Sequence, residues 1–432
     1  MRALVGCCVV LVVLAGCSLP AIGPSDAEDP NDRLGYENGY NATDSLSVTT
    51  ADGLNASERE AVLGRAMARI ETIRGLEFEE TVTVELVTRE EYRANRGGGP
   101  TPSADERVFV NQRWEALFAV GEDADATAAF ESVYGSSVIG FYSNGRIVIV
   151  SDSESPELDS RTLAHELVHA LQDQHLGFGP GRSTFDGARA REGLVEGDAN
   201  YVESLYDARC NASWSCLPIP ERPEDPGSFN RGIYGTLIQP YVEGPELVGA
   251  LHERGNWTAV NDAYGRFPES TEQTIHPERY PEEPVVEVTV EDRSDESWSR
   301  LDRERWSDRL GESGVYTMFR TNGLFHDHDP YDYSHPATTG WAGDRLVPYT
   351  NADTGESAYV WRLEWDSPED AREFVAAYRD LLVKQNATRS GDRYTIPTGP
   401  YADAFRVTRD GSTVTIVNAP TEGALDAVHA RD

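Results

Sequence analysis

The stretch RTLAHELVHALQDQH, residues 161–175, places His165 and His169 four residues apart, with Glu166 directly after the first histidine. Its leucine and valine residues recur at helical spacing, so an amphipathic helix is predicted. Positions i and i+4 lie on one helix face, so both imidazoles can reach one ion. Glu166 is offset to the side, where a carboxylate can take a proton from water without ligating the ion. The alternative is an ordinary helix whose histidines share a face.

A catalytic metal site needs a third protein ligand. The segment AREGLVEGDANYVESLY, residues 190–206, predicts a second helix with an acidic residue near its start. Glu196 would supply an oxygen ligand beside the two histidines. Glu192, one turn earlier on the same face, is the alternative ligand. Gly197 and Ala199 are expected to let this helix pack closely against the first.

An HExxH motif followed by Glu-Gly-x-Ala-x-Tyr on a later helix resembles the gluzincin metallopeptidases. The resemblance implies an α+β core of helices and a small mixed sheet, with an edge strand beside the motif helix where a peptide substrate adds. It also implies one Zn²⁺ per chain, held by His165, His169 and Glu196, with Glu166 as general base. The hairpin GRIVIVSD, residues 145–152, would carry the edge strand. The 26 residues between His169 and Glu196 exceed the spacing of aminopeptidase-type members.

A closer resemblance rests on HALQDQH, LVEGDA and STEQTIHPERYPEE. Together these are similar to segments of a group of bacterial and haloarchaeal surface lipoproteins, over roughly residues 80–380. This resemblance implies a place on the cell surface and says little about the substrate.

Supporting roles near the metal fall to residues chosen by type and position. Asp198 could orient a ligand histidine through its second ring nitrogen. Tyr201 and His276 are candidates for the second shell or for oxyanion stabilisation; His276 precedes Pro277, so a structural turn is its alternative. Tyr241 and Tyr280, like Tyr201, are candidate oxyanion donors by residue type alone. His175 is expected as a helix-end residue, with a metal ligand as the alternative. The segment FHDHDPYDYSH (325–335) is expected as a solvated loop, with a metal site as the alternative.

The N-terminus predicts export. An apolar run from Ala3 to Ala15 is too short to span a bilayer and precedes Gly16-Cys17. This pattern resembles a lipoprotein signal (1–17) with Cys17 lipidated, and a plain secretory signal is the alternative. Residues 18–50 are rich in Pro, Gly, Asn and Asp, as in a flexible polar tether. The mature protein would therefore sit on the outer face of the membrane, held only by its lipid.

The remaining cysteines and the sequons agree with export. Cys210 and Cys216 are expected to form a disulfide, with a zinc pair as the alternative. Five Asn-x-Ser/Thr sequons are candidates for glycosylation, with Asn41 in the tether the best placed: Asn41, Asn55, Asn211, Asn256 and Asn386.

The charge excludes one class of partner. The chain carries 74 Asp and Glu against 38 Lys and Arg, a formal charge of −36. Lys384 is the single lysine. So acidic a surface repels nucleic acid and anionic membranes. The composition resembles that of proteins from extremely halophilic archaea, in which concentrated salt screens self-repulsion.

Local patterns predict two domains, a metallopeptidase-like α+β domain at 51–290 and a smaller α+β domain at 291–432. The predicted function is a cell-surface zinc metallopeptidase acting on peptide or protein substrates; the alternative is a non-catalytic surface or adhesion lipoprotein with a structural zinc. In the first domain the sequence predicts a helix at 55–76 capped by Ser57 and Glu60, a strand and a helix at 80–96, a helix at 108–135 and a hairpin at 138–153. After residue 300 it predicts a helix, a strand, a second helix, a pair of strands and a short final helix.

Overall fold

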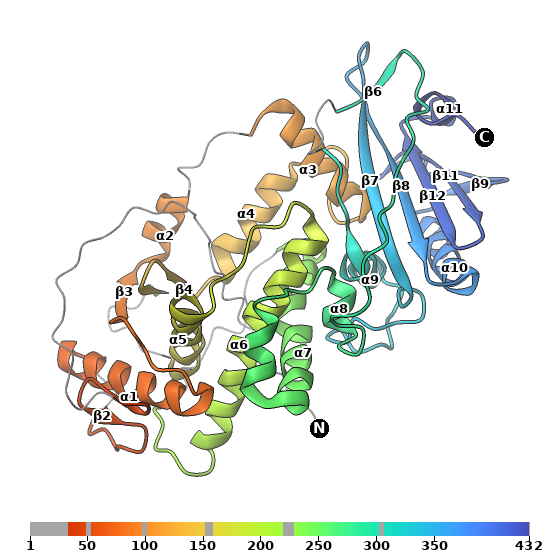
Figure 1. Ribbon diagram of the computed structural model, residues 1–432. Coiled ribbons are helices and arrows are strands. Elements are labelled where there is room, and N and C mark those ends of the chain that lie inside the picture. The colour runs from red at the N-terminus through yellow and green to blue at the C-terminus, as the bar shows by residue number, and fades with distance from the viewer. Residues whose placement is uncertain are drawn as a thin grey trace.

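The computed structural model describes residues 33–48, 53–96, 102–151, 159–218, 229–301 and 306–431. It has an α+β architecture: a helical body with small sheets, followed by one larger antiparallel sheet (Figure 1). The predicted signal peptide, including Cys17, lies outside the described residues.

A three-stranded sheet lies beside the motif helix of the helical body. Its order is β3-β5-β4, with β3 parallel and β4 antiparallel to β5. The predicted hairpin is confirmed, turning at Asn144 and Gly145, both of which have positive φ. However, the edge strand beside the motif helix is β4, whereas the strand within GRIVIVSD, β5, is central in the sheet. The elements are β3 (Thr83–Val87), β4 (Gly140–Ser143), β5 (Arg146–Val150), α1 (Ala56–Arg74), α2 (Arg89–Arg96), α3 (Ala104–Ala116), α4 (Ala126–Ser137), α5 (Ser160–His175), α6 (Phe185–Cys210), α7 (Arg231–Ala263) and α8 (Thr271–Ile275).

Two helix predictions are corrected. The cap of α1 is Asn55, whose side chain accepts from the backbone of Glu58 in a capping box, two residues before the predicted Ser57 and Glu60. The helix predicted at 108–135 is two helices, α3 and α4, because the chain turns between them at Phe118, with φ of 50°.

Part of the predicted tether is not a free linker. Residues 33–48 contain a two-stranded sheet, β1 (Tyr36–Glu37) and β2 (Tyr40–Asn41), packed on α1. The Gly35 N–H donates to Glu71 Oε2 at 2.7 Å, and Arg69 Nε donates to the Ala42 carbonyl at 2.8 Å. Both α1 side chains are fully buried, so they need these partners.

The C-terminal part is a seven-stranded antiparallel sheet, with order β6-β7-β8-β12-β11-β10-β9. Alternate residues of its strands face opposite sides. The sheet and its helices comprise β6 (Trp298–Arg300), β7 (Trp341–Asn351), β8 (Ser357–Trp365), β9 (Thr388–Ser390), β10 (Arg393–Thr395), β11 (Ala404–Asp410), β12 (Thr413–Ala419), α9 (Gly311–Thr321), α10 (Pro368–Lys384) and α11 (Leu425–Val428).

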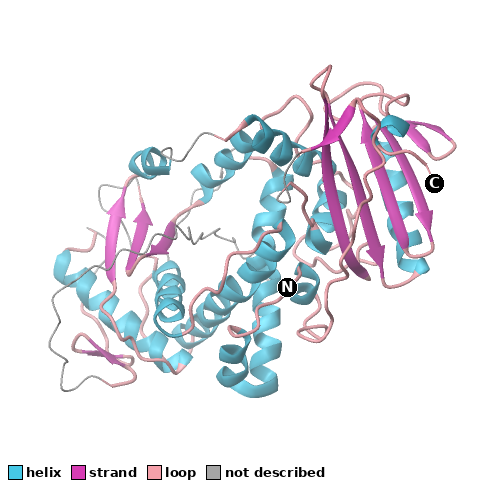
Figure 2. Ribbon diagram, turned by 45° about the horizontal axis from the view of Figure 1, so that its top comes forward, coloured by secondary structure: helices cyan, strands magenta, loops and turns pink. Residues whose placement is uncertain are grey.

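The two faces of this sheet have different covers, visible in Figure 2. On one face, Trp361 and Ile416 pack against Phe374 of α10 in a core that also takes in Trp114 of α3 and Leu237 of α7. The largest core therefore crosses residue 290, where the domain boundary was predicted. The other face is covered in part by α11.

The closest helix contact in the body joins α6 to α7. A Cβ on Gly197 would lie 2.4 Å from the Gly244 carbonyl carbon, and one on Gly244 would lie 2.3 Å from the Gly193 oxygen. Gly197 was expected to bring α6 close to α5, but it faces α7 instead. Ala199 does pack in the core shared with α5.

Replacing Gly197 with alanine should destabilise the protein by about 3 kcal/mol or more, at the upper end of the usual cost of overpacking, because backbone blocks the new methyl group. The free energy of unfolding in high salt measures this. Gly249→Ala on α7 is the control, since its Cβ would meet only Tyr201 at 3.4 Å. An alanine at Gly197 tolerated as well as one at Gly249 would contradict this packing.

Candidate metal centre

Three buried side chains from two helices converge on one point. His165 Nε2 and His169 Nε2, on α5, lie 3.1 Å apart. Glu196 Oε2, on α6, lies 3.2 Å from the first nitrogen and 3.3 Å from the second. No more than 2% of any of the three residues is exposed. Their ligand atoms can hold a metal ion, and the sequence had selected the same three residues.

Glu166 lies beside this donor set and does not belong to it. Its side chain is fully buried, and neither carboxylate oxygen makes a hydrogen bond of ordinary geometry. The edge strand β4 passes close by, since a Cβ on Gly140 would lie 3.5 Å from Glu166 Oε1. Burial raises the pKa of Glu166 to about 7, against the opposing effect of His169 and His165. A buried carboxylate without partners is costly unless something occupies the space before it.

Without an ion, the donor set is a network of opposite charges. Burial lowers the pKa of His165, but Glu196, Glu203 and the charge of Glu166 outweigh it and raise that pKa to about 10. Burial raises the pKa of Glu196, but the two histidines bring it down to about 2. The ion-free site therefore holds a proton on His165 at neutral pH.

His169 is oriented by Gln172, one turn later on α5. His169 Nδ1 lies 2.7 Å from Gln172 Oε1. Gln172 Nε2 donates to the Val195 carbonyl at 2.9 Å and to the Tyr264 hydroxyl at 2.8 Å, so its oxygen is the acceptor. His169 Nδ1 therefore carries the proton, which leaves the lone pair of Nε2 directed at the donor set.

Asp198, predicted to orient a ligand histidine directly, acts one residue further away. It accepts from Tyr264 at 2.8 Å and lies 3.4 Å from Gln172 Nε2. Arg74 of α1 holds both of its oxygens, with the Nε–Oδ1 distance 3.1 Å. Asp198 therefore fixes Gln172, which in turn fixes His169.

Glu203 is a supporting residue that the sequence analysis missed. Glu203 Oε2 lies 3.5 Å from His165 Nδ1, the ring nitrogen that does not face the donor set. A carboxylate in this position orients a ligand histidine and increases its basicity. The spacing in the sequence could have indicated it, because Glu203 follows Glu196 by seven residues and so lies two turns further along the same helix face.

The rival third ligand, Glu192, has a different partner. Its Oε2 lies 2.7 Å from Arg189 Nη2 on the same helix. It is absent from the donor set, which contains Glu196.

One tyrosine, Tyr241 of α7, lies against a residue of the donor set. Its ring stacks on that of His165, with centroids 6.3 Å apart and planes at 17°. Its hydroxyl is buried without a partner. Burial raises the pKa of Tyr241 well above its ordinary value, with Glu196 adding to the effect. Tyr280 instead donates to the Arg266 carbonyl at 2.6 Å.

Tyr201 does not support the site as predicted. Five residues after Glu196, it lies about 140° further around α6. Its hydroxyl is 3.5 Å from His252 Nδ1, and its ring packs against Trp257.

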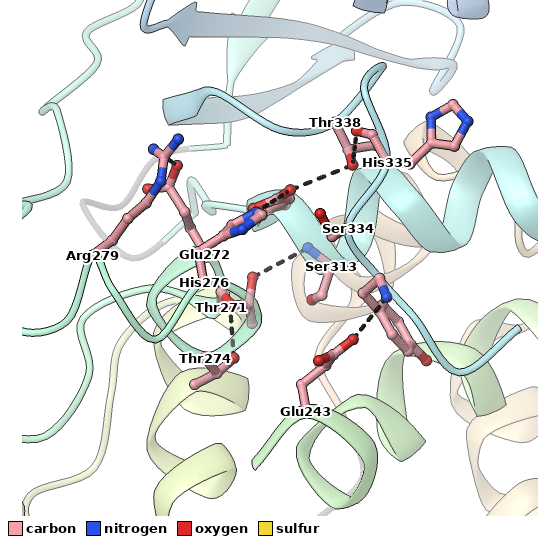
Figure 3. A network of polar contacts seen from close by, with 12 residues as sticks. Glu243, Thr271, Glu272, Thr274, His276, Arg279, Ser313, Ser334, His335 and Thr338 are labelled. Atoms are coloured by element: carbon pink, nitrogen blue, oxygen red, sulfur yellow. Dashed lines mark hydrogen bonds and ion pairs between the residues drawn. The ribbon is translucent and has the colours of Figure 1, made fainter. Parts of the chain in front are cut away.

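His276 belongs to a separate polar network between α7, α8, α9 and the loop before β7. Its Nε2 lies 3.1 Å from Glu312 Oε1. Figure 3 shows it in this network with Glu272, Arg279 and Thr338. Among the described contacts of His276, none reaches the donor set, and those that are described place it in this separate network.

A second group of acids resembles a metal site but already has a cation. Glu272, Glu283 and Asp366 gather around Arg279 Nη1, at 2.5, 2.9 and 2.9 Å. One guanidinium therefore pairs with all three carboxyl groups. His175 ends α5, with Nε2 2.6 Å from the Glu77 carbonyl, and residues 325–335 supply no further metal cluster among the described residues.

The predicted disulfide joins Cys210 to Cys216, with Cα atoms 5.5 Å apart. It follows α6 directly and packs on the core beside α1. Of the sequon asparagines, Asn55, Asn211, Asn256 and Asn386 are exposed and Asn41 is half-buried.

Comparison with known proteins finds a matching family for the C-terminal region only. Residues 299–429, nearly the whole seven-stranded sheet with α9, α10 and α11, match a family described as a domain of unknown function (DUF8575). No curated protein and no solved structure matches the chain. Within the described ranges, every helix is too short or too polar to cross a bilayer.

Proposed function

We propose that this chain is a gluzincin-like, zinc-dependent peptide hydrolase in which Glu166 is the general base. One observation carries the proposal: a three-ligand donor set stands beside a buried carboxylate whose oxygens make no hydrogen bond of ordinary geometry. A purely structural site has no need of that carboxylate.

The donor set fits zinc. Zinc–ligand bonds of about 2.0–2.1 Å at tetrahedral angles place ligand atoms about 3.3 Å apart. The three distances here are 3.1, 3.2 and 3.3 Å. Two histidines and one carboxylate are a usual catalytic set, which leaves the fourth position open for water or substrate. His165, His169 and Glu196 would hold the ion.

Zinc in this position supplies Lewis acidity, which polarises a carbonyl and makes a water easier to deprotonate. Glu166 takes the proton of the attacking water and passes it to the leaving amine. In the ion-free site burial already raises the pKa of Glu166 to about 7, which is the direction that favours a general base at neutral pH. The hydroxyl of Tyr241, buried and without a partner, is the donor available to the developing oxyanion.

The edge strand favours a peptide as substrate. Among the strands of the described ranges, β4 pairs with β5 alone, and it runs past Glu166. An extended peptide can pair with such an edge through its own backbone, which would bring a peptide bond to the site whatever its side chains.

Zinc uptake should release about one proton per chain at pH 8, because the pKa of His165 is about 10 without the ion and the ligand must be neutral. Apparent zinc affinity should then rise about tenfold per pH unit up to that pKa. Titration calorimetry in two buffers with different ionisation heats counts the proton. Uptake without proton release would contradict a protonated His165 in the ion-free site.

Tyr241→Phe should lower kcat by about 10²–10³-fold with little change in KM, as does the loss of one oxyanion donor. Tyr201→Phe is the control, since its hydroxyl faces His252. Steady-state cleavage of one peptide by both variants measures the effect. An equal loss in both, or in neither, would rule out this role for Tyr241.

The proposed function is tested by incubating the chain in high salt with a mixed peptide library. Mass spectrometry should find new peptide ends with zinc, none with a chelator, and full recovery when zinc is restored. Cleavage that persists in the chelator, or zinc binding without any cleavage of peptides or unfolded proteins, would contradict it.

A further inference from the structure

A small polar cluster lies beside the largest core, where α3 meets the seven-stranded sheet (Figure 1). Gln112 and Glu115 lie on one face of α3, because residues three apart are neighbours on a helix surface. Asn418 lies on β12, and Asp403 directly precedes β11. No more than 4% of any of the four residues is exposed. We call these four residues the oxygen cluster.

Both amide groups of the oxygen cluster donate to its carboxyl groups. Gln112 Nε2 lies 2.6 Å from Glu115 Oε2, and Asn418 Nδ2 lies 2.8 Å from Asp403 Oδ2. The carboxyl groups of Glu115 and Asp403 also contact each other. The two amide oxygens, Gln112 Oε1 and Asn418 Oδ1, are buried and make no hydrogen bond of ordinary geometry. Since buried polar atoms normally have partners, these oxygens indicate a ligand that is positively charged or donates hydrogen bonds.

The oxygen cluster contains two acids without a cation. Among the described ion pairs, none joins Lys or Arg to Glu115 or Asp403. Burial raises the pKa of Glu115 well above its usual range, with Asp403 and Glu122 adding to the effect. Burial also raises the pKa of Asp403, against the hydrogen bonds of Asn418 and Glu115. Two buried carboxylates in contact are unfavourable unless a cation or a shared proton lies between them.

The chemistry of the donors favours a calcium ion. Oxygen ligands suit Ca²⁺ and Mg²⁺, whereas zinc is bound mostly by nitrogen and sulfur. Burial raises the pKa of Tyr359, with the charges of Glu115 and Asp403 adding to the effect, so its hydroxyl is a further oxygen nearby. A divalent ion balances two carboxylates, whereas a sodium ion or one shared proton leaves a net negative charge. Magnesium usually keeps several waters, which suits a more exposed site than this one.

We propose that the oxygen cluster binds one calcium ion, which links α3 of the helical body to the seven-stranded sheet. The ion is bound by the carboxylates of Glu115 and Asp403 and by the amide oxygens of Gln112 and Asn418. Two of these ligands come from α3 and two from the sheet, so the bound ion stabilises their contact. The proposal does not depend on zinc or on hydrolysis at the metal centre.

Calcium binding by the full, zinc-loaded chain tests this proposal. Equilibrium dialysis in concentrated KCl, which screens weak sites on an acidic surface, should find one calcium ion per chain beside the zinc. Magnesium should bind at least about tenfold more weakly. At constant KCl, added calcium should raise the midpoint of thermal unfolding, because the ion binds only the folded chain.

Glu115→Gln and Asp403→Asn should each weaken calcium binding about 100-fold, since the affinity of an oxygen site follows the number of its charged ligands. Glu122→Gln is the matched control. Glu122 is an exposed acid near Asp403 and lies outside the oxygen cluster. In concentrated KCl its loss should change the calcium affinity less than about threefold.

The proposal is overturned if the wild type binds no calcium, a result that stands whether or not a buried variant folds. It is also overturned if Glu115→Gln and Asp403→Asn bind calcium as tightly as the wild type, or if Glu122→Gln loses as much affinity as they do. A wild type that ignores calcium, and whose free energy of unfolding falls as pH rises through the raised pKa values, would show that Glu115 and Asp403 share a proton instead.

Discussion

Glu166→Gln is expected to lower peptide cleavage by about 10³–10⁴-fold while zinc uptake stays unchanged. Glutamine has the same shape but cannot accept a proton from water. Because Glu166 is fully buried, no base from the solvent can reach its position and take over the proton transfer. The variant should bind zinc normally, because Glu166 lies outside the donor set.

Initial rates on one peptide, with zinc content measured on the same samples, give both quantities. Glu253→Gln, an exposed site on α7, controls for the change of charge. Cleavage at the wild-type rate by the Glu166 variant would contradict a general-base role. If the variant failed to bind zinc, Glu166 would instead contribute to metal binding.

Glu196→Gln is expected to weaken zinc binding by more than about 100-fold, since even an outer partner of a ligand can be worth that much. The carboxylate supplies the only oxygen of the donor set. Competition with a chromogenic chelator measures the affinity.

Glu192→Gln is a matched control on the same helix face, because Glu192 pairs with Arg189 and not with the donor set. It should retain wild-type affinity. If the Glu192 variant lost zinc and the Glu196 variant kept it, the third ligand would be Glu192, one turn earlier on α6.

The donor set could be predicted because its geometry is local. His165 and His169 share a face through the period of one helix, and α5 spans the predicted residues. Glu196 could be chosen by type and by the small residues that follow it. The hairpin before α5 was legible from Asn144-Gly145, a turn with positive φ.

The residues that support the donor set depend on which helices pack against one another. The hydrophobic periodicity of the sequence does not specify that packing. Tyr241 reaches His165 from α7, and Arg74 reaches Asp198 from α1. The sequence indicates that Gly197 lies at a helix contact. It does not indicate that the contact is with Gly244 of α7 and not with α5. Glu203 was accessible by spacing alone and was overlooked.

Strand β7 was not predicted, and Pro348 is a reason. Proline lacks the N–H of a central strand, and β7 lies between β6 and β8. The Pro348 carbonyl accepts from Leu301 on the β6 side, at 3.4 Å, just past the end of that strand. The missing donor therefore faces a position where regular pairing has ended.

The most direct test of the proposed metal centre is an anomalous difference map recorded at the zinc edge from crystals of the zinc-loaded protein. One peak is expected per chain, within about 2.1 Å of His165 Nε2, His169 Nε2 and a Glu196 oxygen. A peak elsewhere, for example among Glu272, Glu283 and Asp366, or no peak between the two histidines, would contradict it.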